Sequence, residues 1–167
     1  YMIRVTAPDG WGFTKKGKTT DILIAFTEQG NYLYIPVNEV KENKWNDEGF
    51  HVNQLVNLAA DDRLIGAVAV RKFRHDLFMV LLSRSGYIKR IRLDSFPVIR
   101  RTKPIPAIKL EKGDTLVGFT CTSGNSDIFI ASEEGYGSFY NENDIFISNP
   151  RSRGIKAGSF GGKPLAG

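Results

Sequence analysis

Lysines and arginines concentrate in one stretch of the chain, where side chains of this type can bind a polyanion. Residues 71–110 contain 11 Lys and Arg against 2 Asp and Glu, a net charge of +9, and residues 111–150 contain 1 against 7, a net charge of −6. The 167 residues together have a net charge of only +5, so basic and acidic residues are segregated along the sequence. Such a block is typical either of a surface for a polyanion or of an ordinary solvated face. Charge alone leaves both interpretations open.

Two short segments repeat the same pattern of cations. Arg101-Thr-Lys-Pro-Ile-Pro-Ala and Arg151-Ser-Arg-Gly-Ile-Lys-Ala lie fifty residues apart, so Arg101 corresponds to Arg151 and Lys103 to Arg153. Contacts to phosphates need cations on a convex surface and no base-reading geometry. The predicted contact residues are Lys89, Arg90, Arg92, Arg100, Arg101, Lys103, Arg151, Arg153 and Lys156. A further cluster, Arg71, Lys72 and Arg74, fits a contact or a solvated loop equally well.

Residues for catalysis or metal binding do not form a recognisable set. His51 and His75 have no second ligand at metal spacing, and Cys121 has no nearby histidine partner. The acidic pairs Asp61-Asp62 and Glu133-Glu134 are interpreted as turn residues. We therefore expect no catalytic site, no metal and no cofactor in this chain.

A repeat organises the elements that must position the cations. Apolar runs that begin at Ile22, Phe78 and Phe129 each reach a glycine eight residues later, at Gly30, Gly86 and Gly137. Short runs rich in Ile, Val, Phe and Tyr predict strands, and the glycines predict tight turns between them. A period of about fifty residues belongs to blade or solenoid arrays. After Gly86 the cations fall on both faces of an extended chain, so we expect Lys89 and Arg90 to face solvent.

These patterns predict an all-β domain with about four antiparallel strands in each repeat and a further turn at Gly113. One partial domain is expected over residues 1–167. Its parts are the end of a preceding blade (1–20, with one strand from Met2 to Thr6 and a basic turn at Lys15 to Lys18), a blade (21–75), a second blade (76–126), a partial blade (127–160) and a tail (161–167). Three to four blades leave an incomplete ring with an open sheet edge.

The repeat resembles that of the C-terminal domains of bacterial type II topoisomerase A subunits. The resemblance rests on Gly86-Tyr-Ile-Lys-Arg-Ile and on the Leu-to-Asp segments Leu58–Asp62 and Leu110–Asp114, and it covers roughly residues 20–160. Thr27-Glu-Gln-Gly-Asn-Tyr-Leu-Tyr-Ile-Pro-Val, with Trp45 downstream, is similar to the topoisomerase IV version. The Gln-Arg-Arg-Gly-Gly-Lys-Gly box of gyrase is absent, which favours topoisomerase IV over gyrase.

This resemblance implies a fold and a role. The fold is an incomplete β-pinwheel, a propeller-like array in which a strand is lent between neighbouring blades. Its basic rim would bind and bend duplex DNA without sequence preference, beside the B subunit of the enzyme and the rest of the A subunit. ATP, Mg²⁺ and the nucleophilic tyrosine of strand passage would lie elsewhere in the parent enzyme, which would act in decatenation or relaxation.

Two alternatives to this role remain open. The chain would be the C-terminal wrapping domain of the gyrase A subunit, or a propeller-like module that binds an acidic protein partner. The single cysteine and the lack of an apolar run near 18 residues predict a cytoplasmic location without a membrane. The resemblance implies association with the bacterial nucleoid.

Overall fold

The computed structural model describes residues 2–6, 12–16, 18–44 and 46–158, so Trp45 and the expected tail at 161–167 lie outside the described residues. All regular structure in these residues is β-strand, apart from short 3-10 turns at η1 (Val37–Glu39), η2 (Val52–Gln54), η3 (Leu93–Ser95) and η4 (Glu142–Asp144). The predicted all-β class is confirmed. No helix among the described residues is long and apolar enough to cross a membrane.

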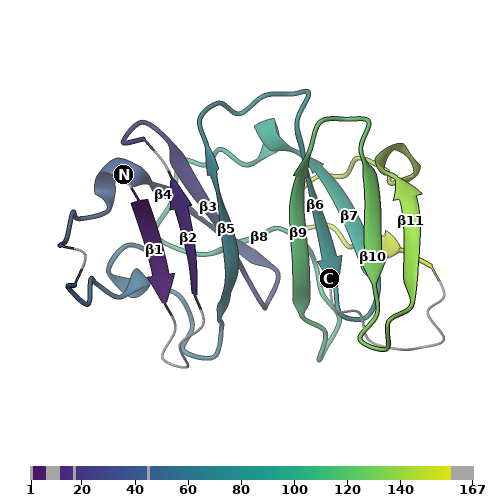
Figure 1. Cartoon of the computed structure of the whole chain (residues 1–167), viewed down its shortest axis with the longest axis horizontal. Coiled ribbons are helices and arrows are strands. Elements are labelled where there is room, and N and C mark those ends of the chain that lie inside the picture. Colours follow the sequence, from purple (N-terminus) through teal and green to yellow (C-terminus); the bar gives the residue numbers. More distant parts are fainter. Residues whose placement is uncertain (1, 7–11, 17, 45, 159–167) are drawn as a thin grey trace.

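The strands form two four-stranded antiparallel sheets between two hairpins (Figure 1). The first hairpin pairs β1 (Met2–Thr6) with β2 (Gly12–Lys16). The first blade has the strand order β5 (Leu64–Val70), β3 (Ile22–Thr27), β4 (Asn31–Pro36) and β8 (Ile105–Pro106). The second blade has the order β9 (Leu116–Thr122), β6 (Phe78–Ser83), β7 (Tyr87–Arg92) and β12 (Ile155–Lys156). The partial blade pairs β10 (Asp127–Ala131) with β11 (Gly137–Asn141).

The basic stretch at Lys15 was expected to be part of a turn, and this expectation is wrong. Lys15 and Lys16 belong to β2, where they pair with Ile3 and Met2 of β1. The alternation of residues around Gly12 is too short and too polar to have indicated a strand.

The outermost strand of each blade comes from the following repeat, as the resemblance implied. Beyond β8, the Ala107 N–H donates to the Gly30 carbonyl at 2.9 Å, and beyond β12 the Ala157 N–H donates to the Gly86 carbonyl at 2.8 Å. Equivalent bonds fifty residues apart place the segments that follow Arg101 and Arg151 at the same position in successive blades.

Three hairpin turns in the described residues share one geometry, with a glycine at positive φ. These glycines are Gly30, Gly86 and Gly135, at 79°, 83° and 85°. The expected third turn glycine, Gly137, is instead the first residue of β11 and pairs with Ala131. The sequence Gly-Tyr-Gly offers two candidates, and the apolar run alone did not separate them. Each turn is also closed by a side-chain hydroxyl that accepts the N–H four residues later, from Thr27, Ser83 and Ser132.

Buried side chains lie on both faces of the central strands. Ile24 and Phe26 of β3 belong to the core between the first and second blades, whereas Leu23 and Ala25 belong to a core on the opposite face. A third core joins the second blade to β10–β11 through residues that include Val80, Leu82, Ile128 and Ile130. Burial on both faces explains why these runs are continuously apolar instead of alternating.

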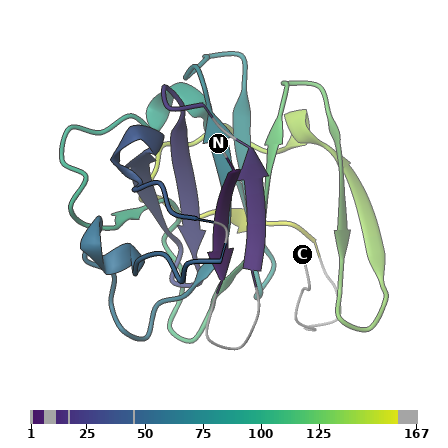
Figure 2. The ribbon, with the colours of Figure 1, turned by 60° about the vertical axis from the view of Figure 1, so that its left-hand side comes forward.

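The blades follow one another across the molecule as an arc. The hairpin β1–β2 lies on one side of the two blades and β10–β11 on the other (Figure 1). Figure 2 shows the same strands after a turn about the vertical axis. On β10–β11, Phe129 and Phe139 are exposed and contact each other, with ring centroids 5.1 Å apart.

Candidate nucleic-acid interface

Two loops carry most of the predicted contact residues, and each leads into the outermost strand of a blade. Arg100, Arg101 and Lys103 precede β8, while Arg151 and Arg153 precede β12. The strand that follows each loop pairs with an equivalent strand: Ile105 pairs with Tyr32 of β4, and Ile155 with Ile88 of β7. The fold therefore places the two sets of cations at matching outer positions of successive blades.

The side chains of these loops are available to solvent. Arg100, Lys103, Arg151, Arg153 and Lys156 are exposed, and Arg101 is partly exposed. Two of them pair with surface carboxylates: Arg101 with Glu39 at 2.9 Å and Arg153 with Glu111 at 2.9 Å. Exposed pairs of this kind contribute about 0–1 kcal/mol, so a phosphate can replace the carboxylate at small cost.

Two of the exposed cations, Lys156 and Arg153, lie beside the ring of Tyr87 on β7. Lys156 Nζ lies 4.8 Å from the ring centroid of Tyr87, and the guanidinium of Arg153 lies 5.8 Å from it. The Tyr87 hydroxyl donates to Glu111 Oε1 at 3.3 Å. These contacts orient the two cations near the outer edge of the second blade. Arg92, also exposed, is paired with Asp94 at 2.8 Å.

Lys89 does not face solvent, so this part of the expectation is wrong. Its side chain is on the face of β7 toward the first blade, and the residue is only 1% exposed. The Nζ atom donates to the carbonyl oxygens of Ala107 at 2.8 Å and Ser152 at 2.9 Å. Ala107 follows the lent strand β8, and Ser152 precedes the lent strand β12. Lys89 thus joins both crossing segments to the second blade, and burial lowers its pKa to about 8.

Arg90 is also buried, against the same expectation. It is on the opposite face of β7, where its guanidinium lies 4.0 Å from the ring centroid of Phe78. Its Nε is 3.2 Å from Glu142 Oε2, and its Nη1 donates to the Glu142 carbonyl at 2.8 Å. Arg90 therefore connects the second blade to the partial blade.

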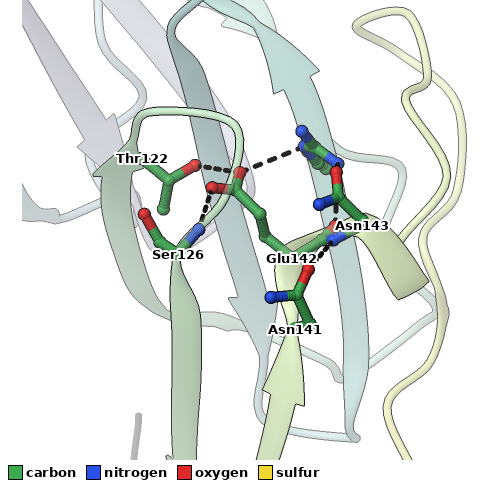
Figure 3. Close-up of polar contacts among 6 residues, drawn as sticks. Thr122, Ser126, Asn141, Glu142 and Asn143 are labelled. Atoms are coloured by element: carbon green, nitrogen blue, oxygen red, sulfur yellow. Dashed lines mark hydrogen bonds and ion pairs between the residues drawn. The ribbon is translucent and has the colours of Figure 1, made fainter.

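The Glu142 carboxylate is held by further donors, as Figure 3 shows. Thr122 Oγ1 donates to Oε2 at 2.6 Å, and the Ser126 N–H donates to Oε1 at 2.6 Å. Burial acts to raise the pKa of Glu142, but these hydrogen bonds and the charge of Arg90 outweigh it and hold the pKa below its usual value.

The two buried cations have an identifiable origin in the repeat. Lys89 and Arg90 stand three and four residues after Gly86, where the first blade has Leu33 and Tyr34 after Gly30. Leu33 is fully buried and Tyr34 stacks on Phe73. Comparison of these positions could have indicated that both cations lie between blades, a signal that strand alternation alone did not carry.

The remaining candidates have ordinary structural contacts. Arg71 lies 3.5 Å from Asp21, and Arg74 is paired with Asp76. His51 caps η2 by accepting the Asn53 N–H at 3.2 Å on Nδ1. Cys121 is a free, exposed thiol. Among the described residues, no three His, Cys, Asp or Glu side chains gather as metal ligands.

The arrangement of blades and lent strands agrees with known proteins. A family model described as DNA gyrase C-terminal domain, beta-propeller, matches residues 21–71 and 78–123, more than half of the chain. The chain belongs to this family. Members of the family occur in type II topoisomerase A subunits, and this coarse assignment confirms the resemblance described from the repeat.

Relatives and solved structures favour the topoisomerase IV branch. The A subunit of DNA topoisomerase 4 from Bacillus subtilis (strain 168) is 30% identical over 138 residues, which are 83% of this chain and 17% of the relative. The corresponding Staphylococcus aureus (strain MRSA252) protein is 30% identical, with the same shares covered. The chain thus spans about a sixth of the length of these curated relatives.

Solved members of the family have the same architecture. The crystal structure of the C-terminal domain of DNA topoisomerase IV superposes with a TM-score of 0.83 at 27% identity, covering 93% of this chain and 47% of that chain. The DNA gyrase A C-terminal domain superposes with a TM-score of 0.69 at 18% identity, covering 87% and 45%, and shares the fold.

Proposed function

We propose that this domain binds duplex DNA along the outer loops of successive blades and bends it, with little dependence on base sequence. The observation that supports the proposal is the placement of Arg101 and Lys103 before β8 and of Arg151 and Arg153 before β12, fifty residues apart in equivalent positions. A curved row of exposed cations fits phosphates, which repeat regularly along a duplex.

The revised contact set contains only exposed or partly exposed cations. It comprises Arg92, Arg100, Arg101, Lys103, Arg151, Arg153 and Lys156. Lys89 and Arg90 act indirectly, because they fix the segments and blades that carry this set. Bending a duplex around the arc costs on the order of a few kcal/mol, which the phosphate contacts offset.

Within a longer topoisomerase polypeptide, the domain would hold a DNA segment for the strand-passage core. The B subunit and the rest of the A subunit would be its protein partners, and ATP and Mg²⁺ would bind outside this domain. We assign no catalytic role or cofactor to the chain itself. The similarity to topoisomerase IV proteins favours a role in decatenation or relaxation over the wrapping role of gyrase.

A competition experiment separates DNA binding from recognition of an acidic protein. The domain is titrated onto two labelled duplexes of equal length and unrelated sequence, with an acidic polypeptide as competitor. The proposal predicts similar affinities for both duplexes. The acidic polypeptide should displace the duplexes only when its total charge is in large excess over that of the DNA. Failure to bind either duplex, with tight binding to the polypeptide, would favour a protein-interaction module.

A further inference from the structure

The Glu111 carboxylate lies where donors from two other segments of the chain meet. Arg153 Nη1 lies 2.9 Å from Glu111 Oε1, and the Tyr87 hydroxyl donates to the same oxygen at 3.3 Å. Lys156 Nζ lies 4.8 Å from the ring centroid of Tyr87, so a second cation stands next to this tyrosine. We refer to Arg153, Tyr87, Lys156 and Glu111 together as the Glu111 site.

The Glu111 site is open to solvent. The side chains of Arg153 and Glu111 are 50% and 47% exposed, Lys156 is exposed, and Tyr87 is partly exposed. An exposed ion pair contributes little to stability, so another anion can displace the carboxylate at small cost. Phosphate oxygens of DNA accept hydrogen bonds from arginine, lysine and tyrosine side chains, which are the three donor types present in this site.

The Glu111 site lies beside the second cation-bearing loop and is joined to the first. Arg153 belongs to the second loop itself. The segment that leaves the first loop continues through β8 to Lys109, whose N–H donates to the Ser152 carbonyl at 2.9 Å. Lys109 is exposed, and Glu111 follows two residues later. A duplex that contacts the second loop at Arg153 therefore also reaches Tyr87 and Glu111.

The first blade does not repeat the residues of the Glu111 site. Asn31 follows its turn glycine, at the position where the second blade has Tyr87. Ala59 stands in its Leu-to-Asp segment, at the position where the second blade has Glu111. The site therefore distinguishes the second blade from the first. A search of the sequence for cations does not reveal it, because Tyr87 is neutral and Glu111 is acidic.

We propose that Glu111 occupies a phosphate-binding site, from which a backbone phosphate of the bound duplex displaces it. In the complex, Arg153 and the Tyr87 hydroxyl donate to the phosphate, and Lys156 adds its charge beside them. Tyr87 is then a DNA-contact residue without charge, and Glu111 competes with the DNA for these donors. This inference rests on the proposed DNA-binding function and adds to it a residue that limits the affinity for the duplex.

Duplex-binding titrations with two substitutions test the Glu111 site. Glu111→Ala removes the competing carboxylate and should strengthen binding by up to roughly fivefold. In the Glu111→Ala background, Tyr87→Phe removes a hydroxyl that serves only the phosphate, so binding should weaken roughly three- to tenfold. Tyr87→Phe leaves the net charge unchanged, so the slope of log affinity against log salt should stay the same.

Two controls separate the Glu111 site from general effects of lost charge and of a lost hydroxyl. Glu133→Ala removes a carboxylate from another exposed ion pair, with Arg84, and should leave duplex affinity close to that of wild type. Tyr140→Phe removes a hydroxyl on β11 and should leave the affinity of Glu111→Ala unchanged.

The outcomes distinguish failure of this inference from failure of the proposed function. Equal gains from Glu111→Ala and Glu133→Ala would overturn the site while preserving the phosphate track, and so would the absence of a loss from Tyr87→Phe in the Glu111→Ala background. Absence of salt-dependent duplex binding by wild type would overturn the proposed function itself.

Discussion

Arg90 and Glu142 form a buried ion pair between the second blade and the partial blade, with Nε and Oε2 3.2 Å apart. The Arg90 and Glu142 side chains are 5% and 0% exposed. Between the first and second blades the equivalent positions are Tyr34 and Leu93; Leu93 belongs to the apolar core and Tyr34 packs against it. The same place in the repeat is therefore apolar at one interface between blades and ionic at the next.

Removal of one partner from this pair should be much more costly than removal of both. Arg90→Met leaves a buried carboxylate without its cation and should lower the free energy of unfolding by about 3–5 kcal/mol. Combining Arg90→Met with Glu142→Leu should recover most of that loss, because no buried charge remains. Denaturant unfolding of the single and double variants measures the difference. Equal destabilisation of the single and the double variant would show that the pair contributes through packing alone.

The low pKa of Glu142 predicts a loss of stability in acid. Its folded-state pKa is below the unfolded value, so its contribution is present above the unfolded pKa of about 4.3 and is lost as pH falls through the folded pKa. The difference in melting temperature between wild type and Glu142→Gln should therefore be largest near neutral pH and shrink in acid. A difference that stays constant down to the lowest accessible pH would contradict this origin.

The low pKa of Lys89 also makes stability rise with pH, but in alkaline solution. Its folded-state pKa of about 8 lies below the ordinary lysine value of about 10.4, so between these values the unfolded chain binds more protons and stability rises with pH. A neutral amine retains two N–H donors, which match the carbonyls of Ala107 and Ser152. Lys89→Met leaves the Ala107 carbonyl without this donor and should cost about 1–3 kcal/mol. The gap between wild type and variant should widen from about pH 8 to 10, and a constant gap would argue against buried titration of Lys89.

Gly154 is needed for close approach of the lent strand β12 to β7. A Cβ at this position would lie 2.5 Å from the Ile88 carbonyl oxygen, so Gly154→Ala must displace the segment that carries Arg153 and Lys156. We expect lower thermal stability and weaker DNA binding. Asn149→Ala, an exposed change in the same loop, is the matched control and should leave both unchanged. Unaltered stability and binding in Gly154→Ala would mean that β12 docking does not position the contact residues.

The sequence predicted the blades better than it predicted which cations are exposed. Repeated apolar runs identified the strands of each blade, and the correspondence of Arg101 with Arg151 located two loops in equivalent positions. Local alternation could not reveal that lent strands and neighbouring blades cover both faces of β7 and bury Lys89 and Arg90. That burial depends on contacts with Ser152 and Glu142, more than fifty residues away in the chain.

The turn between β10 and β11 is another feature that the local sequence pattern did not decide. Gly135 and Gly137 both follow an apolar run, and the turn glycine is identified by the positive φ of Gly135 and by the closing bond from its N–H to the Ser132 carbonyl. Thr27 and Ser83 precede the other two turns at the same spacing, so the hydroxyl residue was the more specific sequence signal.

The salt dependence of duplex binding tests the central claim most directly. Arg100, Arg101 and Lys103 are replaced by Ala together, and the control replaces Arg63, Arg84 and Lys112, three exposed cations outside the two loops. Both variants remove the same charge. The loop variant should lower the slope of log affinity against log salt by up to roughly 0.9 for each phosphate that it no longer binds, while the control keeps a slope near that of wild type. Equal slopes in wild type and the loop variant, with unchanged affinity, would contradict a DNA track along these loops.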